Sequence, residues 1–404
     1  KHKTIIIIAC ILVPGAVLVA VGFLCCRNGV AGVTGDATRG VKLNRYRQVH
    51  FMTRGGSGFV TVVQREGDGA QFVLKQVECA NEAQRNAVFK EYRLLKMLYD
   101  SGCRVPRPIE FTMIPDSRRF GNRGSIASEP MNAMNSGSTS GGTDRQPLLQ
   151  QQQQIANIVM EYFPDGDLSS YVQQFEQAAL KIPERTLLRL AWRGYAVLDQ
   201  MHRMRPAAIV HLDVKPQNVA LNIAKGQIFL LDFGCAVEVM APSTSGKGGT
   251  RVAAAPQQLH PGLADDHGVT PVYAPPERFT SRPTPSPAMD VWSMGATILH
   301  AALRHVPPLN EASDDGVARS LGEIERELRD AGYSSSFFEL TRGAITYHPM
   351  RRATAAELSK AAGELLERLG GPPALLDSEG FDRPPDAGRR PGTPTPSVNA
   401  KGPH

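Results

Sequence analysis

The sequence predicts an α+β fold in which a strand-rich first part is followed by a larger helical part. Short apolar runs bounded by polar residues mark the strands of the first part, and the clearest are Thr61–Val63, Phe72–Val77 and Ile109–Ile114. From Leu168 onward apolar residues recur at helical spacing, most clearly between Glu184 and Met204. With 404 residues, 42% of them hydrophobic, the chain is long enough to build a large two-lobed core with tails.

The N-terminal segment Thr4–Cys26 is an unbroken apolar run flanked by basic residues. A helix of this length crosses roughly 30 Å of hydrocarbon, whereas the apolar core of a signal peptide usually has about 7–15 residues. Residues 1–27 are therefore predicted to form a hydrophobic N-terminal helix that anchors the chain in a membrane, with a signal segment of the secretory pathway as the alternative. Which side of the membrane the chain occupies stays open. Cys25 and Cys26 are either a palmitoylation site or the apolar end of the span.

Composition divides the remaining chain into one large domain with two insertions. Residues 28–45 are predicted to be a linker, 46–369 the domain and 370–404 a disordered Pro/Gly-rich tail. The segment 115–154, rich in Ser, Gly and Asn and closed by glutamines, is predicted to be a low-complexity insertion between two strands. The second of these strands is Ile155–Tyr162. Before the insertion, Phe89, Tyr92, Leu95 and Leu98 recur at the spacing of an amphipathic helix.

Charge and cysteine content exclude several classes of function. The formal net charge is +6, but the basic residues are dispersed and are not interleaved with aromatic residues, so no nucleic acid partner is expected. The six cysteines show no paired spacing. Neither a disulfide framework nor a zinc site is indicated.

Two sequence motifs carry the chemistry. The first is His211-Leu212-Asp213-Val214-Lys215-Pro216-Gln217-Asn218, and the second is Asp232-Phe233-Gly234 after the apolar run Ile228–Leu231. Together they resemble the catalytic loop and the metal-binding triplet of the eukaryotic protein kinases. The resemblance implies a two-lobed protein-kinase fold with a small β-rich lobe and a larger helical lobe.

The same resemblance implies an enzyme that uses ATP and Mg²⁺ to phosphorylate protein hydroxyl groups. Asp213 corresponds to the catalytic base, and Lys215 to the cation that neutralises charge on the transferred phosphoryl group. Asn218 and Asp232 correspond to the magnesium ligands. Lys75 corresponds to the strand lysine that contacts the phosphates of ATP, and Glu91 to its acidic partner on a helix.

The remaining nucleotide contacts are also implied by resemblance. The run from Gly56 through Gly58 to Val63 resembles the Gly-rich loop, although Thr61 stands where the family has its third glycine. Glu161 and Phe163 fall in the hinge that meets adenine, and Asp167 matches the acidic residue that contacts ribose. A helix N-cap is an equally good interpretation of Asp167. Val73 and Ala220 correspond to the ceiling and floor of the adenine slot, which in the family are normally Ala and Leu.

Further residues indicate the Ser/Thr branch of the family. Lys215, and Thr270 before Pro271, are typical of that branch, in which the Thr bonds to the base and the lysine. Glu277 and Arg352 are expected to pair, and Asp290 to anchor the backbone of the catalytic loop. The activation segment, 232–277, is predicted to be lengthened by the insertion Pro242–Asp266.

Departures from the family pattern leave other functions open. Leu212 replaces the Arg that usually receives an activation-segment phosphate, so such a phosphate lacks its usual partner. Cys235 is interpreted as a packing residue, with a redox switch as the alternative. Thr61 and Val73 keep a pseudokinase scaffold as the alternative function. The apolar leader, the insertions and Leu212 are also similar to the secreted rhoptry kinases of apicomplexan parasites.

Overall fold

The computed structural model describes residues 45–55, 58–115, 154–240, 270–309, 311–370 and 380–383. The apolar segment Thr4–Cys26, which the sequence predicts to be a helix, lies outside these ranges, as do most of the two predicted insertions. Within the described ranges, no helix is both long and apolar enough to cross a bilayer.

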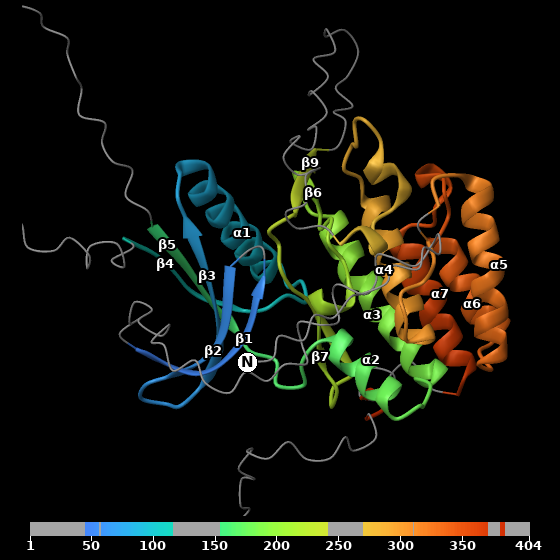
Figure 1. Ribbon diagram of the computed structural model, residues 1–404, viewed down its shortest axis with the longest axis horizontal. Helices are drawn as coiled ribbons and strands as arrows, with labels where there is room; N and C mark the ends of the chain where they lie inside the picture. Colours follow the sequence, from blue (N-terminus) through green and yellow to red (C-terminus); the bar gives the residue numbers. More distant parts are fainter. Residues whose placement is uncertain are drawn as a thin grey trace, which may run out of the picture. The chain divides into compact units, whose positions relative to one another are not determined.

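The small lobe is built on one antiparallel sheet with the strand order β1-β2-β3-β5-β4 (Figure 1). Its strands are β1 (Tyr46–Gly55), β2 (Gly58–Arg65), β3 (Gln71–Cys79), β4 (Pro108–Pro115) and β5 (Gln154–Glu161). All four strand runs predicted from the sequence lie in β2 to β5. Strand β5 has neighbours on both sides, and its Ala156, Ile158 and Val159 are fully buried.

Helix α1 (Glu82–Asp100) packs against β3, β4 and β5. It begins after Asn81, whose side chain accepts a hydrogen bond from the Gln84 N–H at 2.9 Å and so satisfies one free donor of the first turn. Leu94 and Leu98 are fully buried, and Glu91 lies on the same buried face. Phe89, which the sequence assigns to the apolar stripe, is instead 52% exposed at the edge of that stripe.

The large lobe is mostly helical, and Figure 1 shows its helices α2 to α7 gathered apart from the β1–β5 sheet. They are α2 (Leu168–Gln177), α3 (Glu184–His202), α4 (Pro287–Leu303), α5 (Asp314–Asp330), α6 (Ser335–Ala344) and α7 (Ala355–Arg368). Helix α4 forms the centre of this core, because nearly all of its residues are buried, including Trp292. A side chain at Gly295 would lie 2.7 Å from Ala344 Cβ, so only glycine allows α4 to approach α6 this closely.

Two short antiparallel pairs position the motif loops. Strand β6 (Ala207–Val210) pairs with β9 (Val237–Met240), and β7 (Val219–Asn222) pairs with β8 (Gln227–Leu230). Residues 211–218 connect β6 to β7 and end in the 3-10 turn η2 (Pro216–Asn218), while residues 231–236 connect β8 to β9. The strand pairings therefore bring the two motif loops side by side. The later 3-10 turns are η4 (Pro271–Tyr273), η5 (Pro276–Phe279) and η6 (Pro349–Arg351).

The C-terminal tail departs from the sequence prediction at four residues. Disorder was expected from Gly370 onward, but Gly380–Arg383 pack against the large lobe, and Phe381 is only 5% exposed within its main core. An aromatic side chain that joins the core offsets the entropy cost of ordering this short segment. The rest of the segment beyond residue 370 lies outside the described residues.

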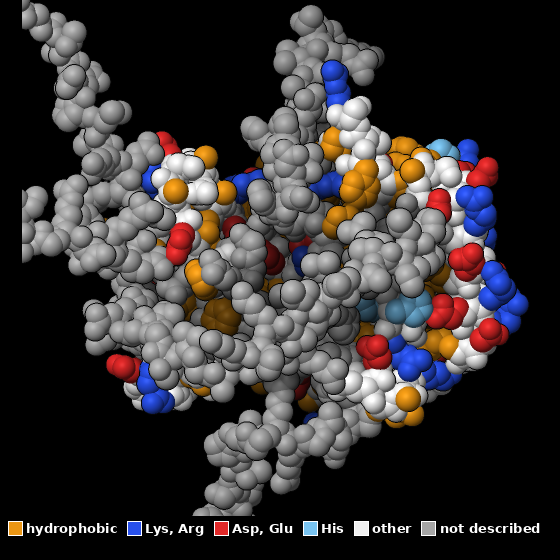
Figure 2. Space-filling view, viewed as in Figure 1, with side chains coloured by type: hydrophobic (Ala, Val, Ile, Leu, Met, Phe, Trp, Pro, Cys, Tyr) orange, Lys and Arg blue, Asp and Glu red, His pale blue; other side chains and the backbone are white. Residues whose placement is uncertain are grey.

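Acidic and basic side chains lie beside each other over α5 and α6, as the right edge of Figure 2 shows. Arg329 pairs with Glu325 at 2.7 Å, and Arg342 pairs with Glu339 on the next helix. Such exposed pairs contribute little to stability, typically about 0–1 kcal/mol each. On this face the positive charge of the chain is thus mixed with negative charge.

Candidate functional site

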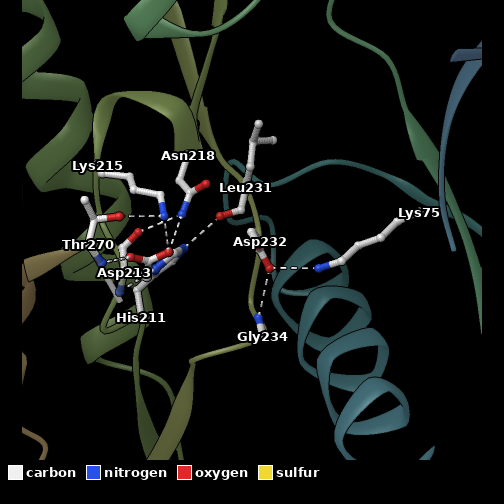
Figure 3. Close-up of polar contacts among 9 residues, drawn as sticks. All are labelled: Lys75, His211, Asp213, Lys215, Asn218, Leu231, Asp232, Gly234 and Thr270. Carbon is white, nitrogen blue, oxygen red and sulfur yellow. Dashed lines mark hydrogen bonds and ion pairs between the residues drawn. The ribbon is translucent and has the colours of Figure 1, made fainter. Parts of the chain in front are cut away.

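The link between the two lobes is an ion-pair network centred on Lys75. From strand β3 its Nζ contacts Glu91 Oε1 of helix α1 at 2.7 Å. The same nitrogen contacts Asp232 Oδ1, from the loop after β8, at 2.9 Å (Figure 3). One buried cation therefore joins the sheet, the helix and the second motif loop.

Charge and burial oppose each other in this network. Burial by itself would lower the pKa of Lys75, but the charges of Glu91 and Asp232 outweigh it and raise that pKa. Burial also acts to raise the pKa of Asp232, but the charge and hydrogen bond of Lys75, with the Gly234 N–H, lower it below its usual value. Lys75 is thus held protonated and Asp232 ionised at neutral pH. The Asp232 side chain keeps 34% exposure, which leaves it accessible from the solvent side.

The second cluster gathers around Asp213. Lys215 Nζ donates to Asp213 Oδ2 at 2.8 Å and to Thr270 Oγ1 at 3.0 Å. Asn218 Nδ2 donates to the Asp213 backbone oxygen at 2.8 Å and to Oδ2 at 3.0 Å, and the Thr270 N–H reaches Oδ1 at 3.4 Å. Figure 3 shows the Lys215 and Asn218 side chains converging on the Asp213 carboxylate, with the Thr270 backbone N–H on its other oxygen and the Thr270 hydroxyl beside Lys215. The bond from Thr270 to the lysine, expected of the Ser/Thr branch, is confirmed.

Buried Asp290 of α4 holds the loop that carries Asp213. Its two carboxylate oxygens accept the backbone N–H groups of His211 and Leu212, each at 2.8 Å, and His202 Nε2 lies 2.9 Å from Oδ2. The predicted anchoring role of Asp290 is therefore confirmed. Leu212 adopts a positive φ of 66°, which is uncommon for a branched side chain and indicates that the surrounding contacts impose this conformation.

His211 joins the two motif loops directly. Its Nε2 lies 3.0 Å from the backbone oxygen of Leu231, and its ring packs against Phe233 with centroids 5.1 Å apart. Figure 3 shows this bond between the cluster around Asp213 and the residue before Asp232. The position of Asp213 relative to Asp232 is thus fixed by a local contact as well as by the strand pairings.

A buried ion pair closes the activation segment against the helical lobe. Arg352 donates to Glu277 through both terminal nitrogens, at 2.7 and 3.1 Å, as predicted. Its guanidinium also lies 5.0 Å from the ring centroid of Trp292. This bidentate geometry orients the end of the activation segment more rigidly than a single contact could.

The Gly-rich hairpin is described only in part, since Gly56 lies outside the described residues. Gly58 follows it with a φ of 127°, and a Cβ there would lie 2.2 Å from the Gln76 backbone oxygen. Only glycine fits this position, because the conformation is strained for other residues and the space beside it is filled.

The register of β2 corrects the sequence assignment at Val63. In the β2–β3 pairing, Val62 lies opposite Val73 and Val60 lies opposite Lys75. Directly opposed residues share a face, and neighbours along a strand point to opposite faces. Val62 therefore shares the face of Lys75 and Val73, whereas Val63 and Thr61 point the other way. The motif match in the sequence points to Val63 and leaves out Val62. The register shows that this match to the Gly-rich motif lies one residue too late.

Comparison with known proteins agrees with this geometry. The model of the protein kinase domain matches residues 147–362, which is more than half of the chain. The chain belongs to the protein kinase family. Similar curated proteins include the MAP kinase kinase skh1/pek1 of Schizosaccharomyces pombe, 28% identical over 37% of this chain and 35% of that protein. The dual specificity mitogen-activated protein kinase kinase dSOR1 of Drosophila melanogaster is 29% identical over 46% of this chain and 40% of that protein.

A longer alignment covers most of the kinase domain. The mitogen-activated protein kinase kinase 2 of Arabidopsis thaliana is 22% identical over 79% of this chain and 72% of its own length. The chain spans less than half the length of the other two relatives.

The hinge of the kinase domain lies between β5 and α2. The Glu161 N–H donates to the Arg107 backbone oxygen at 3.0 Å, and Glu161 Oε2 accepts the Arg107 N–H at 3.1 Å. Phe163 packs on Phe229 of β8 with ring centroids 4.4 Å apart. Asp167 forms an isolated bridge with Ala220, so the hinge exit and the predicted adenine floor are directly joined. The Asp167 carboxylate caps α2 by accepting the Ser170 N–H at 2.7 Å, which is the N-cap interpretation of this residue.

Two residues near the catalytic loop bear on regulation of the kinase. Burial, followed by the negative charges of Asp213 and Asp232, raises the pKa of Cys235 to about 11, which keeps the thiol protonated and favours the packing interpretation. Arg278 of η5 is 8% exposed, and neither of its terminal nitrogens has a hydrogen-bond partner within the described ranges. No pattern in the sequence indicates this buried guanidinium.

Proposed function

We propose that this chain is a Ser/Thr protein kinase that transfers the γ-phosphate of ATP, with Mg²⁺, to hydroxyl groups of protein substrates. The observation that carries the proposal is the simultaneous contact of Lys75 with Glu91 and Asp232. Phosphoryl transfer needs the lysine and the metal-binding aspartate on the same side of one cleft. A kinase fold that had lost its activity would be under no requirement to keep all three groups in this arrangement.

The lysine of β3 would orient the nucleotide. Its raised pKa keeps a full positive charge for the α- and β-phosphates, and Glu91 fixes the direction of the ammonium group. Val62 and Val73 would cover adenine from above, and Ala220 would lie beneath it. Glu161 and Phe163 would present backbone groups to the adenine edge. Asp167 uses Oδ1 to cap α2, so its other carboxylate oxygen, Oδ2, would face ribose.

The nucleophile would be oriented by the cluster around Asp213. In that cluster the carboxylate accepts bonds from Lys215 and Asn218, so its orientation is set before a substrate arrives. A substrate hydroxyl bonded to Asp213 would attack the γ-phosphorus of ATP, forming a new O–P bond as the bond to the bridging oxygen breaks and ADP leaves. The hydroxyl proton would pass to the Asp213 carboxylate. Lys215 would stabilise the negative charge on the phosphoryl group during its transfer. Thr270, by holding Lys215, would connect this step to the activation segment.

The donor set fits a hydrated Mg²⁺ ion. Asn218 and Asp232 offer oxygen ligands, and Mg²⁺ in phosphoryl-transfer sites is usually bound by one or two such protein groups together with phosphates and water. The Asp232 bonds to Lys75 and to the Gly234 N–H go through Oδ1, and the carboxylate is partly exposed. Asn218 and Asp232 would hold the ion, which would supply positive charge that offsets the charge of the ATP phosphates.

The proposal is tested by incubating the full chain with radiolabelled ATP and generic protein substrates, with and without Mg²⁺. Phosphoamino-acid analysis of the products should show phosphoserine or phosphothreonine that depends on Mg²⁺. Phosphotyrosine alone would contradict the assignment to the Ser/Thr branch. Nucleotide binding without any transfer would instead support the alternative, a pseudokinase scaffold.

Membrane attachment through Thr4–Cys26 is a separate proposal, supported by the length and apolar character of that segment. It is tested by expressing the full chain and a form lacking residues 1–27 in the same cells. Only the full chain should remain with the membrane fraction after alkaline carbonate extraction. Equal release of both forms would exclude a spanning anchor.

A further inference from the structure

The packed tail segment Gly380–Arg383 occupies a defined site on the large lobe. The site is formed by Tyr171 of α2, Thr186 and Arg189 of α3, and Ile223 at the end of β7. The ring of Phe381 joins the main hydrophobic core of the lobe. The segment thus has the burial of a core element although the tail has the composition of a disordered region.

Hydrogen bonds hold three successive residues of the segment. Arg189 donates to the Gly380 oxygen at 2.6 Å, and the Phe381 N–H donates to the Ile223 oxygen at 2.8 Å. The Tyr171 hydroxyl donates to the Asp382 backbone oxygen at 2.6 Å. Thr186 donates to the Asp382 carboxylate, and its Oγ1 lies 3.4 Å from the Asp382 nitrogen.

The site is selective at each of these three positions. A Cβ at Gly380 would lie 2.5 Å from the Ile223 oxygen, so the first position accepts only glycine. The second position takes a large aromatic side chain into the core. The third takes an acidic side chain that accepts the Thr186 hydroxyl. The ligand class is therefore a Gly-aromatic-Asp peptide.

The groups that bind the segment are themselves buried. Tyr171 is 1% exposed, Thr186 is fully buried and Arg189 is 2% exposed. These exposures hold with the segment in place, so its departure would break the bonds of these groups and open them to solvent. The segment and the groups that bind it therefore cover each other.

Ile223 connects the site to the nucleotide-binding end of the lobe. Its carbonyl accepts the Phe381 N–H, and its own N–H donates to Asp165 Oδ2 of the hinge exit at 2.8 Å. Two residues earlier, the Leu221 N–H donates to the Gly166 oxygen at 3.0 Å. The same strand carries Ala220, the floor of the adenine slot. The tail segment and the hinge exit therefore both hydrogen-bond to the backbone at the end of β7.

We propose that Tyr171, Thr186, Arg189 and Ile223 form a binding site for a Gly-Phe-Asp peptide, filled by the tail of the chain itself, and that its occupancy supports nucleotide binding. The effect on nucleotide binding rests on the proposed function, whereas the peptide-binding site does not. Phe381 is a positioning residue in this account, since it acts on the nucleotide through Ile223 and β7.

The test uses the full chain with Phe381→Ala, and Leu369→Ala as a matched control, because Leu369 is half exposed and close to the tail. The affinity for Mg·ATP is measured by equilibrium titration, and a fluorescent peptide with the sequence of residues 378–385 is titrated into each protein. Phe381→Ala should weaken nucleotide affinity about 3- to 10-fold, the range expected for coupling through packed elements. Leu369→Ala should change it less than about twofold.

The peptide should bind the Phe381→Ala protein and restore its nucleotide affinity, whereas a peptide with Ala in place of Phe should do neither. Asp382→Ala, a milder change, should give the same pattern if Phe381→Ala does not fold. Unchanged nucleotide affinity in both variants would overturn the coupling, and failure of the peptide to bind would overturn the site. Both readouts are independent of phosphate transfer, so an inactive enzyme would refute the proposed function without affecting this result.

Discussion

At the scale of single residues, two adjacent valines on β2 allow the proposed nucleotide contact to be compared with a packing position. Val62 shares the face of Lys75, and Val63 points to the opposite face. Both are buried, so each truncation to Ala should destabilise the fold by a similar amount, about 1–3 kcal/mol. Only Val62→Ala should also weaken ATP binding, by about fivefold for the lost apolar contact. Nucleotide titration with thermal unfolding of both variants checks this, and equal ATP affinities would contradict the register argument.

The same pair shows where residue-level prediction fails. Asp213, Asn218 and Asp232 were found from the sequence because phosphoryl transfer needs those residue types at fixed offsets. The glycine hairpin lacks such a constraint: glycines at 55, 56 and 58 and valines at 60, 62 and 63 allow two registers of the motif. A shift of one residue exchanges the two faces of a strand, and only the pairing with β3 decides between them.

Leu212 leads to a second prediction at this scale. Because it cannot bind a phosphate, activity should not depend on phosphorylation of the activation segment. Phosphatase treatment, or joint replacement of Ser243, Thr244, Ser245 and Thr250 by Ala, should change the rate less than about tenfold, which corresponds to 1.4 kcal/mol in the barrier. The double change Thr393→Ala with Thr395→Ala, at two Thr-Pro positions of the Pro/Gly-rich tail, is the control for phosphorylation outside the activation segment.

A larger fall in rate would show that another basic side chain performs the role of the arginine that Leu212 replaces. Arg278 is the group to examine in that event, because its buried terminal nitrogens have no partner within the described part of the chain. Arg278→Gln would then reproduce the loss without any change of phosphorylation sites.

At the scale of elements, helix α4 makes stability depend on pH. Burial, with the nearby charge of His305, lowers the pKa of His300 from 6.5 to about 4, and its Nδ1 lies 2.6 Å from the Tyr273 hydroxyl of η4. Between these pH values the unfolded chain binds more protons than the folded one, so stability falls as the pH decreases from 6.5 toward 4. The contribution of neutral His300 is fully present above pH 6.5.

His300→Asn should reduce this pH dependence, because Asn can accept the Tyr273 hydroxyl and does not titrate. When the pH is lowered from 7 to 5, the midpoint temperature of thermal unfolding should decrease less in this variant than in the wild type. His348→Asn, which changes an exposed histidine, should leave the wild-type difference intact. An unaltered pH difference in His300→Asn would show that other groups are responsible.

Secondary structure elements were predictable where their apolar pattern is long. Strands β2 to β5 and helices α1 and α3 follow from period and composition, since each must bury one face. The tail segment was missed because a single phenylalanine among prolines and glycines carries no periodic signal. Its order arises from contacts with α2, α3 and the end of β7, which come together only when these elements are folded.

At the scale of the whole kinase domain, the proposed activity requires groups from both lobes to meet. Lys75 and Glu91 come from the small lobe, and Asp213, Asn218 and Asp232 come from the large lobe. The ion pair between Lys75 and Asp232 closes this arrangement. Local sequence predicted each member, but their meeting depends on the β6–β9 and β7–β8 pairings and on the docking of α1.

The most direct test of the central claim is the initial rate of phosphate transfer at saturating Mg·ATP by the wild type and by Asp213→Asn. Asn keeps the shape of the side chain but removes the group that accepts the proton, so the rate should fall by about 100-fold or more. Asp100→Asn, which breaks only an exposed ion pair with Lys96, should match the wild type. A rate for Asp213→Asn equal to that of the wild type would contradict the assignment of the base and, with it, the proposed mechanism.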